Sequence, residues 1–155
     1  MKTKLEVCID NLAGLDACIK GNADRIELCS SLIHGGLTPE TDLMRHASNA
    51  AIPVRMMVRP KSGSFHYSSQ DLRQMKDDID MARAFGFEGV VFGATLVNGS
   101  IDKNFLELLI THALGLKKQG AIVPGLAPRF SFFNVDRVDK ISYDWGKNHA
   151  YWPNF

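Results

Sequence analysis

Three short runs of this sequence, residues 5–10, 25–29 and 55–59, alternate apolar with polar residues. Successive side chains of a β-strand point to opposite faces of a sheet, so each run predicts a strand with one apolar and one polar face. The apolar faces carry Leu5, Val7, Ile9, Ile26, Leu28, Met56 and Val58. The polar faces carry Glu6, Cys8, Asp10, Arg25, Glu27, Cys29, Arg55, Met57 and Arg59. Three such strands side by side would build a polar patch that contains sulfur atoms.

Helical segments separate the predicted strands. Asn11 predicts the N-cap of a helix that ends at Lys20, with Gly21 in the left-handed conformation after it. Thr38 and Pro39 predict the N-cap and first position of a second helix running to about residue 50. A third helix is predicted from apolar residues spaced by three or four between 72 and 85, a fourth strand at 89–94, and a fourth helix after 102. This alternation indicates βαβ units and a parallel sheet.

The polar strand faces favour a closed barrel over an open sheet. Helices cover both faces of an open doubly wound sheet, whereas a barrel can use part of its interior as a site. We therefore predict an α/β fold, a parallel (β/α) barrel of the TIM type. A complete barrel of eight units needs at least about 200 residues, so this one is predicted to be truncated to about four βα units. The first and fourth strands would be open edges, which predicts a homo-oligomer formed through them.

Composition excludes several classes of protein. The chain has 155 residues, 45% of them hydrophobic, which is enough for the core of one domain. Its net charge of +1 argues against a nucleic-acid partner and against attraction to anionic lipid. No apolar stretch is long enough to cross a membrane, and residues 1–4 lead directly into a strand. The three cysteines form no CxxC motif, so we expect free thiols and a cytoplasmic protein.

Five motifs, in order, resemble the copper homeostasis protein CutC family. They are residues 5–10, 23–29 and 35–39, then 58–60 with Gly63 and Phe65, and 89–93. The resemblance spans about residues 4–117 and implies a (β/α)8 barrel of cytoplasmic proteins linked to copper handling. The fifth-strand motif of the family, His-Arg-Ala-Phe-Asp, is absent. We therefore expect a partial barrel over residues 1–117 and a divergent tail over 118–155, with a short strand at 121–123.

Sulfur ligands on the polar face suit Cu(I), a soft cation that prefers thiolate and thioether groups. Cys8 and Cys29 occupy equivalent places late in the first two strands, and neighbouring strands lie about 4.8 Å apart, so the two thiols could share one copper ion. Met57 could add a thioether, and His34 and His66 in nearby loops are weaker candidates. The alternative is that these cysteines only fill buried space, as we expect of Cys18.

The charged residues of the same face have two interpretations. Glu6, Asp10, Arg25, Glu27 and Arg59 must be paired, because burying an isolated charge costs several kcal/mol; we predict an ion pair between Glu27 and Arg59. Alternatively they belong to a TIM-barrel enzyme acting on a small anionic metabolite, with a carboxylate as base, an arginine as anion clamp and Gly35–Gly36 amides on a phosphate. The sequence offers no nucleophile–base pair, which favours copper binding over catalysis. A poorly functional barrel fragment is the third alternative.

Overall fold

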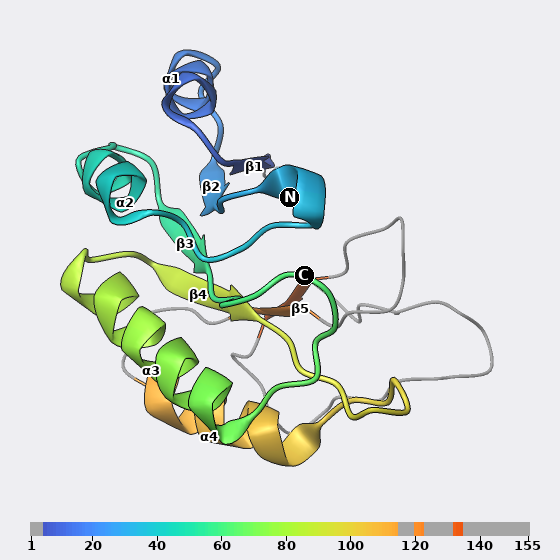
Figure 1. The fold of residues 1–155 in the computed structure, drawn as a ribbon. Helices are drawn as coiled ribbons and strands as arrows, with labels where there is room; N and C mark the ends of the chain where they lie inside the picture. Colours follow the sequence, from blue (N-terminus) through green and yellow to red (C-terminus); the bar gives the residue numbers. More distant parts are fainter. Residues whose placement is uncertain (1–4, 115–119, 123–131, 135–155) are drawn as a thin grey trace.

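A computed structural model describes residues 5–114, 120–122 and 132–134. Strands and helices alternate along them (Figure 1). The strands are β1 (Glu6–Ile9), β2 (Arg25–Leu28), β3 (Val54–Met57), β4 (Gly89–Phe92), β5 (Gly120–Ile122) and β6 (Phe132–Asn134). The helices are α1 (Leu12–Lys20), the 3-10 helix η1 (Leu32–His34), α2 (Thr41–Ser48), α3 (Ser69–Ala84) and α4 (Lys103–Ala113).

The strands form one sheet in the order β1-β2-β3-β4-β5-β6. The first five are parallel to one another, and β6 is antiparallel to β5. A doubly wound sheet reverses its strand order at a switch point, whereas here each strand pairs with the next one along the chain, as in a barrel. The described residues therefore form four consecutive units of a (β/α) barrel, which confirms the predicted α/β fold. The prediction that the fourth strand is an open edge is wrong, because β5 pairs with β4.

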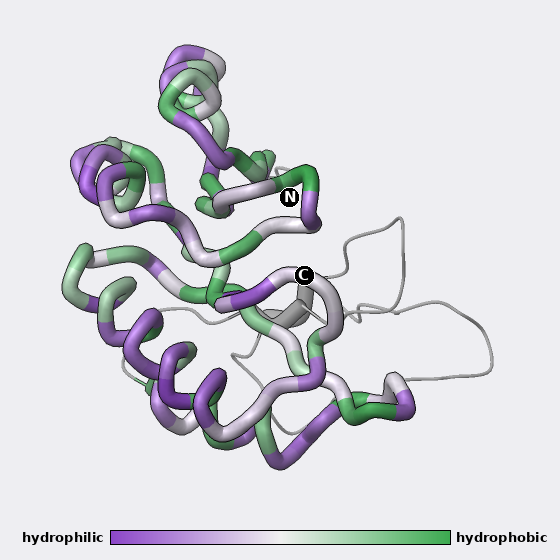
Figure 2. The backbone as a smooth tube through the Cα atoms, viewed as in Figure 1, coloured by the Kyte–Doolittle hydropathy of each residue, from purple (hydrophilic) through white to green (hydrophobic). Residues whose placement is uncertain are grey.

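The helices lie in an arc along one side of the curved sheet (Figure 1). The predicted apolar faces of the strands meet these helices in the main core, which includes Ile9, Ile26, Leu28, Met56, Val58, Val90, Met75, Ile79 and Leu109. Figure 2 shows hydrophobic residues along β3 and β4 and many hydrophilic ones along α3. Leu5 is an exception at 56% exposed, because it precedes β1 at the edge of the sheet. The polar faces of the strands are thus turned to the opposite side of the sheet.

The ends of α1 agree only partly with the prediction. Asn11 is the N-cap, and its side-chain oxygen accepts a hydrogen bond of 2.8 Å from the amide of Gly14. Gly21 is the C-cap, but its φ of −83° is not left-handed. Asn22, with φ of 53°, takes that conformation instead. Asparagine tolerates the left-handed region better than most residues, so it can end the turn.

The start of α2 differs from the prediction. Its N-cap is Glu40 and its first residue is Thr41, so Thr38 and Pro39 precede the helix. Thr38 instead makes long-range hydrogen bonds that are described below. The third helix begins with a capping box in which Ser68 and Asp71 satisfy each other's backbone amides. The fourth helix begins where it was predicted, after residue 102, and Asp102 caps it by accepting a hydrogen bond from the amide of Phe105.

The described residues contain no helix with the length and apolar character needed to cross a membrane. β5 (Gly120–Ile122) corresponds to the strand predicted at 121–123, of which residue 123 lies outside the described residues. The predicted boundary between residues 117 and 118 lies outside them as well.

Candidate functional site

The inner faces of β1 and β2 hold an ion pair at the start of the strands. The register places Glu6 beside Arg25, and Arg25 Nη2 lies 2.6 Å from Glu6 Oε2. Both side chains are less than one fifth exposed. The carboxylate raises the pKa of Arg25, against the opposing effect of burial. This pair neutralises two of the predicted inner-face charges, so it has a clear structural role.

The next inner-face residues bring a thiol against a carboxyl group. Cys8 lies beside Glu27 in the register, and its Sγ donates a hydrogen bond of 3.1 Å to Glu27 Oε2. Glu27 is 1% exposed, and burial raises its pKa to about 7. Burial, followed by the negative charge of Glu27, also raises the pKa of Cys8 above its ordinary value. Cys8 is therefore a protonated thiol at neutral pH, and a metal that binds it must displace a proton.

A thiol and a thioether meet near the ends of β2 and β3. Cys29, Met57 and Val91 form a small buried cluster, separate from the main core. A Cβ atom on Gly36 would lie 3.4 Å from Cys29 Sγ and 3.5 Å from Met57 Cε, so the backbone at Gly36 directly covers both side chains. Burial, followed by the charge of Glu27, raises the pKa of Cys29. Two of the predicted copper ligands are thus in one buried cluster beneath a glycine.

Arg59 ties two loops together above this cluster. Its Nη1 donates to the carbonyl oxygens of His34 and Gly36 at 3.0 and 3.1 Å, and its Nη2 donates to that of Gly63 at 3.0 Å. The guanidinium also lies over the ring of Phe65, 4.2 Å from its centroid. The predicted Glu27–Arg59 ion pair is therefore wrong: three backbone carbonyls and a ring surround the charge of Arg59.

The glycine loop does not offer its amides to a phosphate group. The amides of Gly35 and Gly36 donate to the carbonyl oxygens of Leu32 and Ser31, and that of Leu37 donates to Ser30. Both glycines have φ of 82°, a conformation that other residues adopt only with strain. Because these amides are already bonded and Arg59 binds carbonyls, the predicted anion site at this loop is not supported.

The remaining predicted residues lie around the loops. His34 is exposed, and its backbone takes part in the loop contacts: its carbonyl oxygen accepts from Arg59, and its amide donates to the carbonyl oxygen of Ser31. His66 is exposed too, and its Nδ1 lies 3.4 Å from the carbonyl oxygen of Thr95. Asp10 accepts a hydrogen bond of 3.0 Å from the amide of Leu32 and so anchors the same loop. Among the described residues, no three His, Cys, Asp or Glu side chains form a group that could hold a metal.

Sequence reasoning missed a buried hydrogen-bond chain between α3 and Arg59. The hydroxyl of Thr38 donates to Asp78 Oδ2 and accepts from the amide of Arg59, both at 2.9 Å. Asp78 is 2% exposed and also accepts from Gln74 Nε2. Burial raises the pKa of Asp78. The sequence did carry a signal that Asp78 is buried, because it falls within the apolar spacing of α3, between Met75 and Ile79.

Arg55 is the second residue that the prediction of the site omitted. It is 3% exposed on the inner face of β3, and its Nε has no hydrogen-bond partner among the described residues. Its neighbours in the register are Glu27 and Gly89, the second of which has no side chain. Burial, followed by the charge of Arg25, lowers the pKa of Arg55. Arg55 and Met57 are two residues apart in the strand, so the period of two already placed Arg55 on the same face as Met57.

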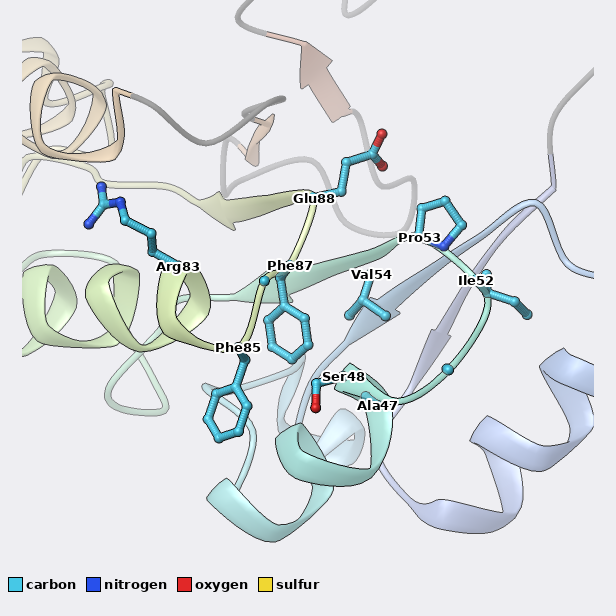
Figure 3. A pocket seen from close by; sticks show the side chains of 11 residues that line it. Ala47, Ser48, Ile52, Pro53, Val54, Arg83, Phe85, Phe87 and Glu88 are labelled. Carbon is cyan, nitrogen blue, oxygen red and sulfur yellow. The ribbon is translucent and has the colours of Figure 1, made fainter.

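A hollow of about 560 Å³ lies at the opposite ends of the strands. Turns before β3 and β4 form it, with Phe85 and Phe87 on one side and Ile52 and Pro53 on another (Figure 3). The rings of Phe85 and Phe87 stack with their centroids 5.8 Å apart. Active sites of barrel enzymes lie at the carboxyl ends of the strands, so the candidate site is the sulfur cluster and its loops.

Comparison with known proteins shows which family this chain resembles. The CutC family model matches residues 3–119. A CutC-family protein of Agrobacterium fabrum is 47% identical over 112 residues, covering 72% of this chain and 45% of the relative. One of Caulobacter vibrioides is 50% identical over 112 residues, covering 72% and 46%. The chain spans about half the length of the curated relatives it matches.

A solved structure has the same arrangement of strands and helices. CutC of Streptococcus agalactiae, described as a candidate copper homeostasis protein, superimposes with a TM-score of 0.67 at 33% identity. The match covers 74% of this chain and 57% of that one. With the family model spanning most of the described residues and both relatives near half identical, the chain belongs to the CutC family.

Proposed function

We propose that this chain is a copper homeostasis protein of the CutC type that binds Cu(I) through Cys29 and Cys8, with Met57 as an additional ligand. The observation that carries the proposal is the burial of the Cys29 thiol and the Met57 thioether against one point of the loop, at Gly36. Thiolate and thioether groups are the ligands that Cu(I) prefers over harder metals. The description of the Streptococcus agalactiae relative supports the choice of copper.

Each sulfur atom has its own place in this proposal. Cys29 and Met57 are neighbours in the buried cluster, and Cys8 lies on the same inner face, close enough to Cys29 to influence its pKa. Both thiols must lose a proton to become ligands, and the pKa of each is raised. Copper binding should therefore release protons and strengthen as the pH rises. His34 and His66 stay weaker candidates, because both are exposed in loops.

Anaerobic titration of the reduced chain with Cu(I), in competition with a chelator, tests the proposal. We expect one Cu(I) per chain, with binding lost in Cys29→Ser and weakened in Cys8→Ser and Met57→Leu. Cys18→Ser is the matched control, because Cys18 is packed in α1 within the main core. Equal Cu(I) affinity in wild type and Cys29→Ser would contradict the proposal, as would equal losses in Cys18→Ser and Cys29→Ser.

A second candidate is an enzyme or binding protein for a small anionic metabolite. Arg55 favours it, because a buried guanidinium whose Nε has no hydrogen-bond partner in the described part of the chain is a suitable group for a carboxylate or phosphate. Inorganic phosphate and small dicarboxylates are the probes. A thermal shift that these anions cause in wild type and in Cys8→Ser, but not in Arg55→Met, would support this candidate over copper binding.

We further propose that the protein acts in a reducing compartment, the cytoplasm. All three cysteines are free thiols in the structure, and exposure to an oxidising environment would place Cys8 and Cys29 at risk of oxidation. We also propose that copies of the chain associate through β1, whose described strand neighbour is β2 alone. Light scattering during size-exclusion chromatography would test this, and a monomer at all concentrations would contradict it.

A further inference from the structure

We propose that Arg59 is a latch that holds the loop of residues 31–36 closed over Cys29 and Met57, and thereby sets how fast this sulfur site exchanges copper with solution. The exchange part of this proposal rests on the proposed function. The closing part rests on the structure of the loop alone and concerns the access of any reagent to the Cys29 thiol.

The loop has a closed base and a tip that is held from outside. At the base, Ser30 and Leu37 exchange two backbone hydrogen bonds of 2.9 and 2.8 Å. Asp10 holds one side through the amide of Leu32. Gly36, next to Leu37 of the base, covers the sulfur atoms, while Ile33 at the tip of the loop is 90% exposed. The sulfur atoms become accessible when residues 33–36, Gly36 included, swing away from Cys29 and Met57.

Arg59 makes the side-chain contacts that hold the loop over the sulfur atoms. One nitrogen, Nη1, holds the carbonyl oxygens of both His34 and Gly36. The other, Nη2, holds Gly63 in the following loop, and Phe65 of that loop packs against the guanidinium. Hydrogen bonds from a charged donor are stronger than neutral ones, and the planar fork of arginine can serve several acceptors at once. A single side chain therefore joins both loops over the sulfur cluster.

The position of Arg59 is itself fixed from α3. Its amide donates to the hydroxyl of Thr38, whose backbone amide donates in turn to the carbonyl oxygen of Arg59. The same hydroxyl is held by the buried carboxyl group of Asp78. The latch is thus anchored to α3, whereas the loop that it holds is paired at its base through the isolated bridge between Ser30 and Leu37 and is held on one side by Asp10. Loss of the guanidinium should free residues 33–36, Gly36 included, without unfolding the barrel.

Alkylation of the reduced full-length chain tests the latch without copper. Iodoacetamide labelling at fixed pH, followed by peptide mass spectrometry, gives a separate rate for each of the three cysteines. In Arg59→Ala we expect the rate at Cys29 to rise about tenfold or more, since several charge-assisted hydrogen bonds are lost. Cys18, buried in α1, reports global unfolding, and its rate should stay unchanged. An unchanged rate at Cys29, or a parallel rise at Cys18, would overturn the proposal.

Two further variants keep the test independent of one substitution. Arg59→Lys keeps the charge but has a single compact nitrogen in place of the two that reach the carbonyls of both loops, so it should give an intermediate rate at Cys29. Gly36→Ala should raise the rate while leaving residue 59 unchanged, because alanine is strained at the φ of 82° that Gly36 adopts. Arg45→Ala, an exposed arginine paired with Asp42 on α2, is the matched control and should match wild type. Equal rates in Arg59→Ala and Arg45→Ala would contradict the latch.

Copper release separates the latch from the proposed function. Bathocuproine disulfonate added to the Cu(I)-loaded chain should withdraw copper faster from Arg59→Ala than from wild type, by a factor similar to that of alkylation. If wild type binds no Cu(I) while Cys29 alkylation still accelerates in Arg59→Ala, the latch stands and the copper function fails. If copper binds but its release is equally fast in both proteins, the effect of the latch on exchange is refuted.

Discussion

Replacing Thr38 by valine tests the buried hydrogen-bond chain between α3 and Arg59. Valine matches the shape of threonine but lacks the hydroxyl that donates to Asp78 Oδ2 and accepts from the amide of Arg59. In the variant, the carboxylate of Asp78, a residue only 2% exposed, and the backbone amide of Arg59 each lose the hydroxyl as a hydrogen-bond partner. An unsatisfied buried group costs about 1–3 kcal/mol, so we expect the free energy of unfolding to fall by roughly 3 kcal/mol.

Urea unfolding with linear extrapolation measures this loss. With a slope of about 2 kcal/mol per molar urea, the midpoint should shift by about 1.5 M. Thr41→Val is the matched control, because Thr41 is exposed at the first position of α2; it should change the stability by less than about 0.5 kcal/mol. A Thr38→Val variant within about 0.5 kcal/mol of wild type would refute the reasoning.

The pH dependence of the unfolding free energy gives a second test of Thr38→Val. Burial raises the pKa of Asp78, so the folded state holds this proton at pH values where the unfolded chain has lost it. Stability from this group is therefore present at low pH and is lost as the pH rises through the folded pKa. Thr38 opposes the effect, because its hydrogen bond favours the ionised form. The penalty of Thr38→Val should thus be larger at pH 7 than at pH 4, and the reverse order would contradict this assignment.

Two further predictions concern a carboxyl group and a helix end. Burial raises the pKa of Glu27 from 4.5 to about 7, so the stability that it contributes is present below the unfolded value and is lost as the pH rises between these values. Glu27→Gln should flatten this decline of the unfolding free energy, which amounts to about 3 kcal/mol at most. Urea unfolding at pH 5 and pH 8 measures it, and an equal loss of stability between these pH values in both proteins would argue against the prediction. Ser68→Ala removes the capping box of α3 and should cost about 1 kcal/mol in thermal unfolding, whereas Ser69→Ala, one residue into the helix, should have little effect; equal losses would show that the cap is unimportant.

The strand faces could be predicted because alternation is a local property of the backbone. Once residues 5–10 and 25–29 are strands, their period of two decides which side chains share a face. The observed register, with Cys8 beside Glu27 and Glu6 beside Arg25, follows the predicted polar face. The placement of Cys29 and Met57 in one cluster follows from the same pattern. Their role as copper ligands remains a prediction.

The partners of Arg59 and Thr38 could not be predicted from residue types. Arg59 binds carbonyl oxygens, which every residue carries, so no side chain in the sequence marks its partners. Thr38 precedes a proline and therefore has the sequence of an N-cap, yet its hydroxyl bonds Asp78, 40 residues later in the chain. In both cases a tertiary contact outweighed the local preference. Such contacts depend on how loops fold over the barrel, which alternation does not encode.

The pairing of each strand with the next has a consequence for how the sheet assembles during synthesis. The paired residues of β1 to β4 lie roughly 20 to 35 positions apart, which keeps their contacts local in the chain. A ribosome adds about 5–20 residues per second, so each strand emerges within several seconds of the one it joins. Every completed unit presents a finished edge to its successor. The sheet can therefore grow vectorially, one βα unit at a time, with no need to wait for a distant segment.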